Sequence, residues 1–338
     1  MKAISVTGKI DEILLGQTLV HEHLNVDSRF LCTDPEASDI PIVELDQSEL
    51  RRNPMRYLDN LNLQDESIVI QELKNFREKG GRTIVDVTPH MGSSRNPELL
   101  RRVSLAADVN IIMGCGWYVG AAHPLQIQEL SDEQLTQLIA NDVLIGDQIS
   151  GVRAGIIGEI GTGDPLLKSE EKVLRAAARA HLITHCPMNI HMAAGCAEVF
   201  HVLDILESEG VKDLTRIVIS HMDVKIDLVQ QREVISRGAR AEYDTFGHTI
   251  YPDSRGFLMP TDEQRVDALA TLASEGYLSS ILVSHDVCLK HLWSHFGGSG
   301  YMPLITDLRG LFHSRGFSNS DIANLLIDNP RNLLAFSI

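Results

Sequence analysis

The chain has few cysteines and no long hydrophobic run, and both absences narrow the class of protein. No stretch of about eighteen uncharged apolar residues occurs, so no membrane-spanning helix is expected. Residues 1–8 contain no apolar core of the length found in signal peptides. The five cysteines are scattered without CxxC spacing, which indicates free thiols in a reducing compartment. We therefore expect a soluble cytoplasmic protein.

Positive charge is also scarce, which argues against polyanionic partners. The sequence has 30 Lys and Arg against 46 Asp and Glu, for a formal net charge of -16. A surface of that sign repels nucleic acids and anionic membranes. We expect a small-molecule substrate as the partner, with no nucleic acid and no membrane.

Three common functional motifs are missing. No GxGxxG follows the first predicted strand and no GxxxxGK[ST] occurs, which disfavours the nucleotide-binding forms of an open, doubly wound sheet. The GxSxG elbow is absent as well, so the sequence does not predict a nucleophilic serine of that type.

What the sequence does contain is an alternation of short apolar runs with longer amphipathic stretches. The runs that we predict to be buried parallel strands are 18–23, 82–88, 110–115, 154–159, 188–191, 216–220, 240–243 and 280–284. Helices are predicted at 170–184, with Ser169 as N-cap, and at 197–209, followed by Gly210 as C-cap. Eight such alternations predict an α/β protein with a (β/α)8 TIM barrel, and an open doubly wound sheet is the competing fold. We expect one domain over 1–338, with the polar residues 25–70 as a long loop over the barrel mouth.

Candidate metal ligands lie at the ends of the predicted strands. His21 and His23 are two residues apart on a strand, so both side chains point to the same face. Other strand ends carry the remaining candidates, which are Glu159, His191, His221 and Asp286. In a barrel these ends converge on one face, where catalytic residues sit. Imidazole nitrogen and carboxylate oxygen are ligands of zinc and similar ions.

Five segments, in order along the chain, carry a more specific signal. They are GQTLVHEHL at 16–24, GIIGEIG at 155–161, IHMAA at 190–194, ISHMD at 219–223 and ILVSHD at 281–286. These motifs resemble the phosphotriesterase family of the amidohydrolase superfamily, and the similarity extends to Asn329-Pro330. Within that family the chain is most similar to the phosphotriesterase-related proteins, which carry GIIGEIG on the fourth strand.

The resemblance implies a binuclear metal centre at the barrel mouth. His21, His23 and Asp286 would hold the more buried ion, and His191 and His221 the more exposed one. A carboxylate and a hydroxide would bridge the two divalent ions. Zinc is the first expectation, and manganese and cobalt suit the same ligands. A homodimer is common in this family, and the sequence leaves the oligomeric state open.

The bridging group departs from the family pattern. Most members use a carboxylated lysine, whereas an ungapped comparison of residues 153–157 places Gly158 at the lysine position and Glu159 one residue later. Because a one-residue slip reverses strand faces, Glu159 requires a local bulge or a shifted strand end to point inward. The alternative is a supporting role for Glu159 and a site with one metal.

Further roles are assigned to residues near the strand ends. Asp286 is expected to be catalytic, accepting a proton from the hydroxide and passing it to the leaving group. Asp223 either supports a ligand or relays protons, or forms a structural salt bridge. The residues predicted to contact substrate are Trp117, Tyr118, Tyr243 and Asp244. Candidate anchors for an anionic group, weighed against a role as solvated loop residues, are His248, Arg255 and Lys290.

Together these observations predict a metal-dependent hydrolase that uses a metal-bridging hydroxide to cleave a small carboxyl-derived substrate, namely an N-acyl amide, ester or lactone. The resembling subgroup includes enzymes acting on N-acetylated amino compounds such as N-acetyltaurine, so a small N-acyl acid is the first substrate to test. The alternatives are a phosphotriesterase that hydrolyses organophosphates, a one-metal deaminase-like enzyme, and a catalytically silent ligand-binding barrel.

Overall fold

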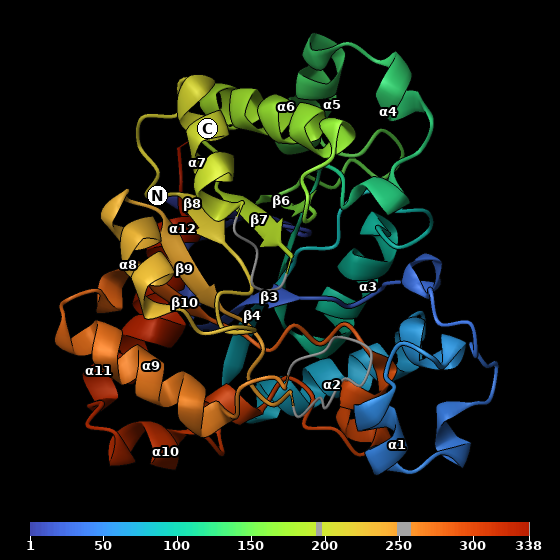
Figure 1. The fold of residues 1–338 in the computed structure, drawn as a ribbon, viewed down its shortest axis with the longest axis vertical. Helices are drawn as coiled ribbons and strands as arrows, with labels where there is room; N and C mark the ends of the chain where they lie inside the picture. Colours follow the sequence, from blue (N-terminus) through green and yellow to red (C-terminus); the bar gives the residue numbers. More distant parts are fainter. Residues whose placement is uncertain (194–197, 249–257, 338) are drawn as a thin grey trace.

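The computed structural model describes residues 1–193, 198–248 and 258–337, and parallel strands surrounded by helices form its centre (Figure 1). A three-stranded run contains β3 (Gln17–Glu22), β4 (Gly81–Asp86) and β5 (Asn110–Met113). A five-stranded run contains β6 (Ile157–Thr162), β7 (Met188–Met192), β8 (Ile217–Ile219), β9 (Arg240–Tyr243) and β10 (Ile281–Val283). Each neighbouring pair within the two runs is parallel.

Backbone hydrogen bonds join the two runs at both junctions. Next to β10 and β3, the N–H of Asp286 donates to the carbonyl of His21 at 3.1 Å. Between β5 and β6, the N–H of Gly155 donates to the carbonyl of Met113 at 2.9 Å. The strands therefore form one cylinder, and the predicted (β/α)8 barrel is confirmed.

A helix follows each barrel strand and covers its outer side. These helices are α2 (Glu66–Glu78), α3 (Pro97–Ala107), α5 (Asp132–Leu144), α6 (Lys168–Thr184), α7 (Val199–Ser208), α8 (Leu228–Ser236), α9 (Asp262–Ser274) and α12 (Asn329–Leu334). Shorter helices lie in the connections, at α1 (Gln47–Arg52), α4 (Gln126–Glu129), α10 (Arg309–Ser314) and α11 (Asn319–Ala323). Within the described ranges, none of the helices has the length and apolar character needed to cross a bilayer.

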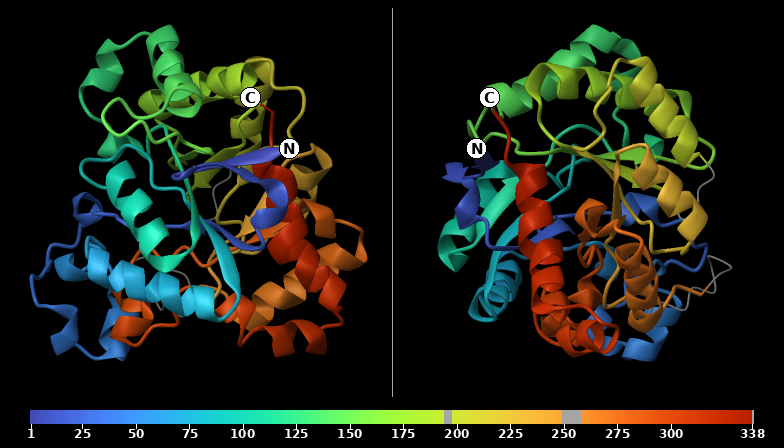
Figure 2. Two further views of the ribbon diagram at one scale, coloured as in Figure 1. Left: turned by 180° about the vertical axis from the view of Figure 1, so that it is seen from behind. Right: turned by 90° about the vertical axis from the view of Figure 1, so that its left-hand side faces the viewer.

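Alternate strand residues fill the barrel interior. Val20, Val85 and Ile112 belong to a buried cluster distinct from the one that packs strands against helices. Ala3 and Leu333 also belong to this inner cluster, at the amino-terminal end of the strands. This end is covered by a hairpin that the sequence did not predict, β1 (Lys2–Ser5) paired antiparallel with β2 (Gly8–Asp11). The two chain ends meet there, as Figure 2 shows, through a bridge between Lys2 and Phe336.

Two local predictions were wrong. The fourth strand was expected at 154–159 but spans Ile157–Thr162, so Glu159 lies within the strand instead of at its end. Ser169 is not the N-cap of α6, because the helix begins at Lys168. The buried carboxylate of Glu170 accepts the N–H of Leu167 at 2.9 Å, and this bond caps the first turn instead.

Residues 25–70 contain more regular structure than a long loop. They include α1 and the first residues of α2, which begins at Glu66. The residues before α1 pair with residues between α1 and α2 at isolated bridges, such as the one between Asp27 and Asn62. Several side chains of this segment, including Leu31 and Met55, line the cavity described below.

Candidate metal centre

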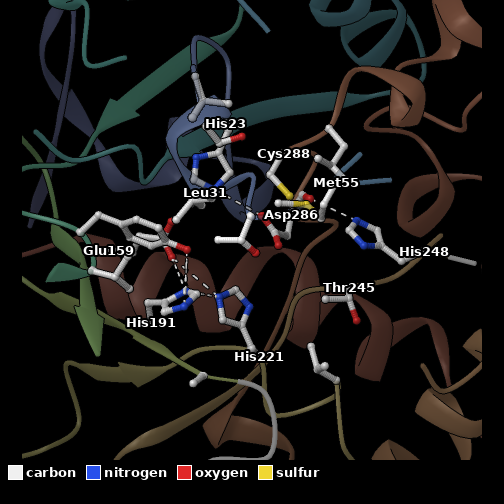
Figure 3. Close-up of a pocket in the computed structure, with 18 of the residues that line it drawn as sticks. His23, Leu31, Met55, Glu159, His191, His221, Thr245, His248, Asp286 and Cys288 are labelled. Atoms are coloured by element: carbon white, nitrogen blue, oxygen red, sulfur yellow. Dashed lines mark hydrogen bonds and ion pairs between the residues drawn. The ribbon is translucent and has the colours of Figure 1, made fainter. Parts of the chain in front are cut away.

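The six predicted ligands lie together at the carboxyl ends of the strands. They come from five different strands or the residues that follow them, and they are His21, His23, Glu159, His191, His221 and Asp286. Five of them are seen around one cavity in Figure 3. The barrel brings these side chains together because parallel strands end on the same face.

Glu159 lies between two groups of histidines. Its Oε1 is 3.4 Å from Nε2 of His23. Its Oε2 is 3.1 Å from Nδ1 of His191, 3.7 Å from Nε2 of His221 and 3.6 Å from Nε2 of His21. One carboxylate therefore faces both groups, which is the position that a ligand shared by two ions must occupy.

The backbone of β6 is irregular where it presents this carboxylate. The pairing with β7 changes register between Ile157 and Ile160, and the Gly158–Glu159 peptide is cis. Gly158 has a φ of +121°, and a Cβ there would lie 2.2 Å from the carbonyl oxygen of Asn189. A side chain does not fit at position 158 on this backbone, and the change of register is of the kind that an inward Glu159 requires.

His21 is held from behind by a second carboxylate. Its side chain is fully buried, and its Nδ1 lies 2.9 Å from Oε2 of Glu242. Its Nε2 is buried and has no hydrogen-bond partner among the described residues. His23 is oriented in a similar way, since its Nδ1 is 2.8 Å from the hydroxyl of Thr88. Both rings therefore turn Nε2 toward Glu159.

His221 is oriented by Asp244. The two oxygens of this carboxylate accept the backbone N–H of His221 at 2.9 Å and face its Nδ1 at 3.0 Å. The Nε2 of His221 then points to Nδ1 of His191, 2.8 Å away. The hydroxyl of Tyr118 lies 3.3 Å from the same nitrogen of His191.

Asp286 is positioned by Glu22, the residue between the two histidines of the first strand. Asp286 has a φ of +47°, and its Oδ1 is 3.3 Å from Nε2 of His23. The buried carboxylate of Glu22 accepts the hydroxyl of Ser284 at 2.7 Å and the N–H groups of His285 and Val287 at 2.9 Å. Glu22 thus fixes the chain on both sides of Asp286.

Tyr243 and Asp244, at the end of β9, do not lie where the predicted substrate contacts require. Adjacent strand residues face opposite sides, so Tyr243 and Asp244 cannot both face the site. Tyr243 points outward, where its hydroxyl donates to Gln231 on α8 at 2.6 Å. Asp244 and Glu242 point inward and support histidines, and neither lines the cavity.

Asp223 forms the structural salt bridge that was one of its two predicted roles. Its Oδ2 is 2.9 Å from Nε of Arg265, and both side chains are fully buried. It also accepts the backbone N–H groups of Asp244 and Thr245. Asp223 therefore holds the chain that carries Asp244.

The remaining predicted contacts divide between the cavity and its surroundings. Tyr118 and His248 line the cavity, whereas Trp117 does not and its ring lies 5.6 Å from that of His90. Lys290 pairs with Asp59 outside the lining. Arg255 lies outside the described residues.

The cavity has a volume of about 810 Å³ and opens above the ligand cluster. Its wall contains four methionines, Met55, Met91, Met192 and Met259, together with Val26, Leu31, Val224 and Leu289. Among the described lining residues, Arg56 is the only lysine or arginine, and its Nε is 3.0 Å from Asp34. The volume suits a small organic molecule with apolar parts.

The electrostatics of the cluster favour positive charge. Burial alone would lower the pKa of His21, but the carboxylates of Glu242 and Asp244 raise this pKa to about 10. Burial would likewise lower the pKa of His221, yet Asp244 holds it well above its usual range. Burial opposes ionisation of Asp286, but the neighbouring His23 and His21 hold its pKa far below the usual range. Several ionised carboxylates thus surround the histidines.

These residues fit divalent metal ions. Two sets of three residues share Glu159, and within each set the ligand atoms lie within 4.8 Å of one another. The sets are His21, His23 and Glu159, and Glu159, His191 and His221. The unpaired, buried Nε2 of His21 is explained by a metal ligand role, since buried polar atoms otherwise find partners. Nitrogen and oxygen ligands of this kind suit zinc, manganese or cobalt.

Comparison with known proteins identifies the family of this chain. The family model for the phosphotriesterase family matches residues 1–334. The chain belongs to the phosphotriesterase family. It is 37% identical over 344 residues to the N-acetyltaurine hydrolase of Tetraodon nigroviridis, with 99% of this chain and 98% of that protein covered. The mouse (Mus musculus) N-acetyltaurine hydrolase is 34% identical, with the same coverage. A solved resiniferatoxin-binding protein from Rhodobacter sphaeroides is 35% identical with a TM-score of 0.95, covering 98% of this chain and 94% of that one.

Membership confirms the predicted family and the predicted class, a metal-dependent hydrolase on a TIM barrel. This phosphotriesterase-family protein also contains supporting residues that the sequence analysis missed, chiefly Glu22 and Glu242. The signal for Glu242 was present, because it is two residues before Asp244 and shares its face of the strand. For Glu22, strand alternation indicated a face opposite to that of the two neighbouring histidines. It did not indicate which backbone N–H groups the carboxylate accepts.

Proposed function

We propose that this phosphotriesterase-family protein hydrolyses a small N-acyl amide whose amine part carries an acidic group. We further propose that the work is done by a single domain with two divalent ions, zinc first. The ligands of these ions would be His21, His23, Glu159, His191, His221 and Asp286. The observation that carries the proposal is the Glu159 carboxylate, whose oxygens lie within 4 Å of ring nitrogens in both histidine groups.

Two divalent ions held here would activate a water molecule near neutral pH and polarise the carbonyl oxygen of the scissile bond. The chain's own contribution to proton transfer is Asp286, whose carboxylate borders both the cavity and His23. We assign Asp286 to accept the proton of the attacking water and return it toward the leaving amine. Glu22 keeps Asp286 in place during this transfer.

The substrate class rests on the relatives and on the cavity wall. Relatives that are 34–37% identical over nearly their whole length are N-acetyltaurine hydrolases. Arg56 on the cavity wall pairs with Asp34 and Glu36 and would have to turn from them to bind an acidic substrate group. The methionines provide an adaptable apolar surface for the acyl part. His191 and Tyr118 lie together on this wall and would contact the scissile amide.

The test is metal content combined with hydrolysis of a substrate panel. We expect about two equivalents of zinc or manganese per chain, and hydrolysis of N-acetylated amino acids or amino sulfonates ahead of lactones and phosphotriesters. Glu159→Gln should lose at least one equivalent and reduce kcat/KM by about 100-fold or more. Glu233→Gln, an exposed carboxylate on α8, is the matched control and should change neither value.

The outcomes separate the alternatives. Preferred cleavage of lactones or phosphotriesters would replace the amide while keeping the metal centre. One equivalent of metal with release of ammonia would favour a one-metal deaminase. Wild-type protein that binds no metal after reconstitution would overturn the proposal and favour a ligand-binding barrel.

A further inference from the structure

A polar layer lies inside the barrel directly behind His21, and no step of the proposed reaction uses it. It consists of Asn189, Ser220 and Glu242, which come from β7, the end of β8 and β9, and all three are fully buried. Their chain neighbours Ile190, Ile219 and Tyr243 belong to the outer cluster between strands and helices. The three polar side chains therefore point into the barrel interior.

Three polar contacts in this layer converge on one oxygen of Glu242. Oε2 of Glu242 accepts the amide of Asn189 at 2.8 Å and the hydroxyl of Ser220 at 2.9 Å, and it lies 2.9 Å from Nδ1 of His21. The hydroxyl of Ser220 is also 2.6 Å from the amide oxygen of Asn189. Asn189, Ser220 and His21 are the three partners of Oε2. Of these, His21 is the one that also faces the proposed metal site.

The second oxygen of Glu242 is buried and has no hydrogen-bond partner among the described residues. Among the residues that the structure describes, no lysine or arginine pairs with this carboxylate, and its ion-pair partner is His21. A buried carboxylate in this state is costly unless positive charge lies close by. An amide or an apolar side chain would avoid this cost but would not give His21 a negatively charged hydrogen-bond acceptor.

We propose that Glu242 is a positioning residue that sets the tautomer of His21 and thereby determines how tightly the inner metal ion is bound. By accepting a hydrogen bond from the Nδ1–H of His21, Glu242 keeps the proton on Nδ1 and leaves Nε2 as the bare nitrogen facing Glu159 and Asp286. Its negative charge also adds to the field that attracts the inner cation. The inference rests on the proposed two-metal centre and adds a residue that touches neither metal nor substrate.

The test measures metal binding, not only activity. Zinc affinity and stoichiometry are determined by chelator competition for the wild type, Glu242→Gln and Tyr243→Phe. In Glu242→Gln we expect the affinity for one of the two ions to fall by about 10–100-fold, with the other ion retained. Tyr243→Phe changes the next residue on the same strand, but its hydroxyl faces α8, so both affinities should equal those of the wild type.

The outcomes keep this inference apart from the proposed function. A wild type that binds two ions, with Glu242→Gln equal to it within about twofold, would overturn the role of Glu242 and leave the metal centre intact. A wild type that binds no metal would overturn the metal centre itself, and the role of Glu242 with it. If Glu242→Gln does not fold, Glu242→Asp decides the matter, because it keeps the charge and lengthens the contact. A partial loss of affinity for one ion then supports the role, and an unchanged affinity overturns it.

Discussion

The two histidine groups that share Glu159 differ in depth and in what lies behind them. The side chains of His21 and His23 are 0% and 5% exposed, and their rear nitrogens face Glu242 and Thr88 in the barrel interior. The side chain of His191 is 18% exposed, and its neighbour across the cavity wall is the hydroxyl of Tyr118. The inner group is part of the barrel core, while the outer group is part of the cavity surface.

Because the two groups differ in burial, we expect them to differ in their contributions to stability and to catalysis. Buried side chains with satisfied partners lose little freedom when a ligand arrives, so the inner group is fixed by folding itself. In the outer group, His191 is partly exposed on the cavity wall and can contact a substrate, whereas His221 is held by Asp244. Substitution of His21 should therefore reduce the stability of the fold, and substitution of His191 should reduce catalysis with little effect on stability.

The largest expected effect comes from comparing His21→Ala with His191→Ala in metal-stripped protein. Loss of His21 leaves Glu242 as an unpaired buried charge, which should lower the free energy of unfolding by about 3–5 kcal/mol. Loss of the partly exposed His191 should lower it by about 1 kcal/mol or less. Urea unfolding in the presence of a chelator measures both values, and equal losses would contradict the distinction between the groups.

An intermediate effect is expected where β6 presents the shared carboxylate. Gly158→Ala places a Cβ against the carbonyl of Asn189, at 2.2 Å before relaxation, and should destabilise the protein by about 1–3 kcal/mol. Because Glu159 must shift with the backbone, metal content should fall as well. Gly151→Ala is the matched control, since Gly151 also has a positive φ of +66° but no atom within 4 Å of its Cβ position. Equal melting temperatures and metal contents for the two variants would refute this account.

The smallest effect is expected on the outer side. Tyr118→Phe removes a hydroxyl that lies 3.3–3.4 Å from the two ring nitrogens of His191. A hydrogen bond of this kind contributes about 0.5–1.5 kcal/mol, so kcat/KM should fall by about two- to tenfold. Metal content and melting temperature should match those of the wild type and of the control Tyr277→Phe. A loss of metal in Tyr118→Phe would show that the outer group depends on this residue more than the comparison allows.

Sequence analysis predicted the parts of the site that follow from strand ends. A ligand at the end of a parallel strand faces the barrel mouth whatever the rest of the chain does, which is why His21, His191 and Asp286 were found. Its errors came from details within strands. Treating Tyr243 and Asp244 alike ignored alternation, and applying it would have exchanged Tyr243 for Glu242.

Other features depended on backbone geometry that residue types do not encode. Strand β6 begins later than predicted. Gly155, which was predicted to belong to this strand, instead donates its N–H to Met113 and joins β5 to the segment before β6. The β1–β2 hairpin is too short for its alternation to be distinguished from a loop. The grip of Glu22 on both sides of Asp286 joins residues more than 260 positions apart, and only the closed barrel brings them together.

The irregular backbone of β6 limits which residue can bridge the proposed metal ions. On this backbone a lysine at position 158 would collide with Asn189, and a carboxylate at 159 depends on the changed register. A lineage that moved between a lysine bridge and a glutamate bridge would have to change both the residue and the path of the strand. Exchange of one bridge for the other therefore couples a change of residue to a change in strand path.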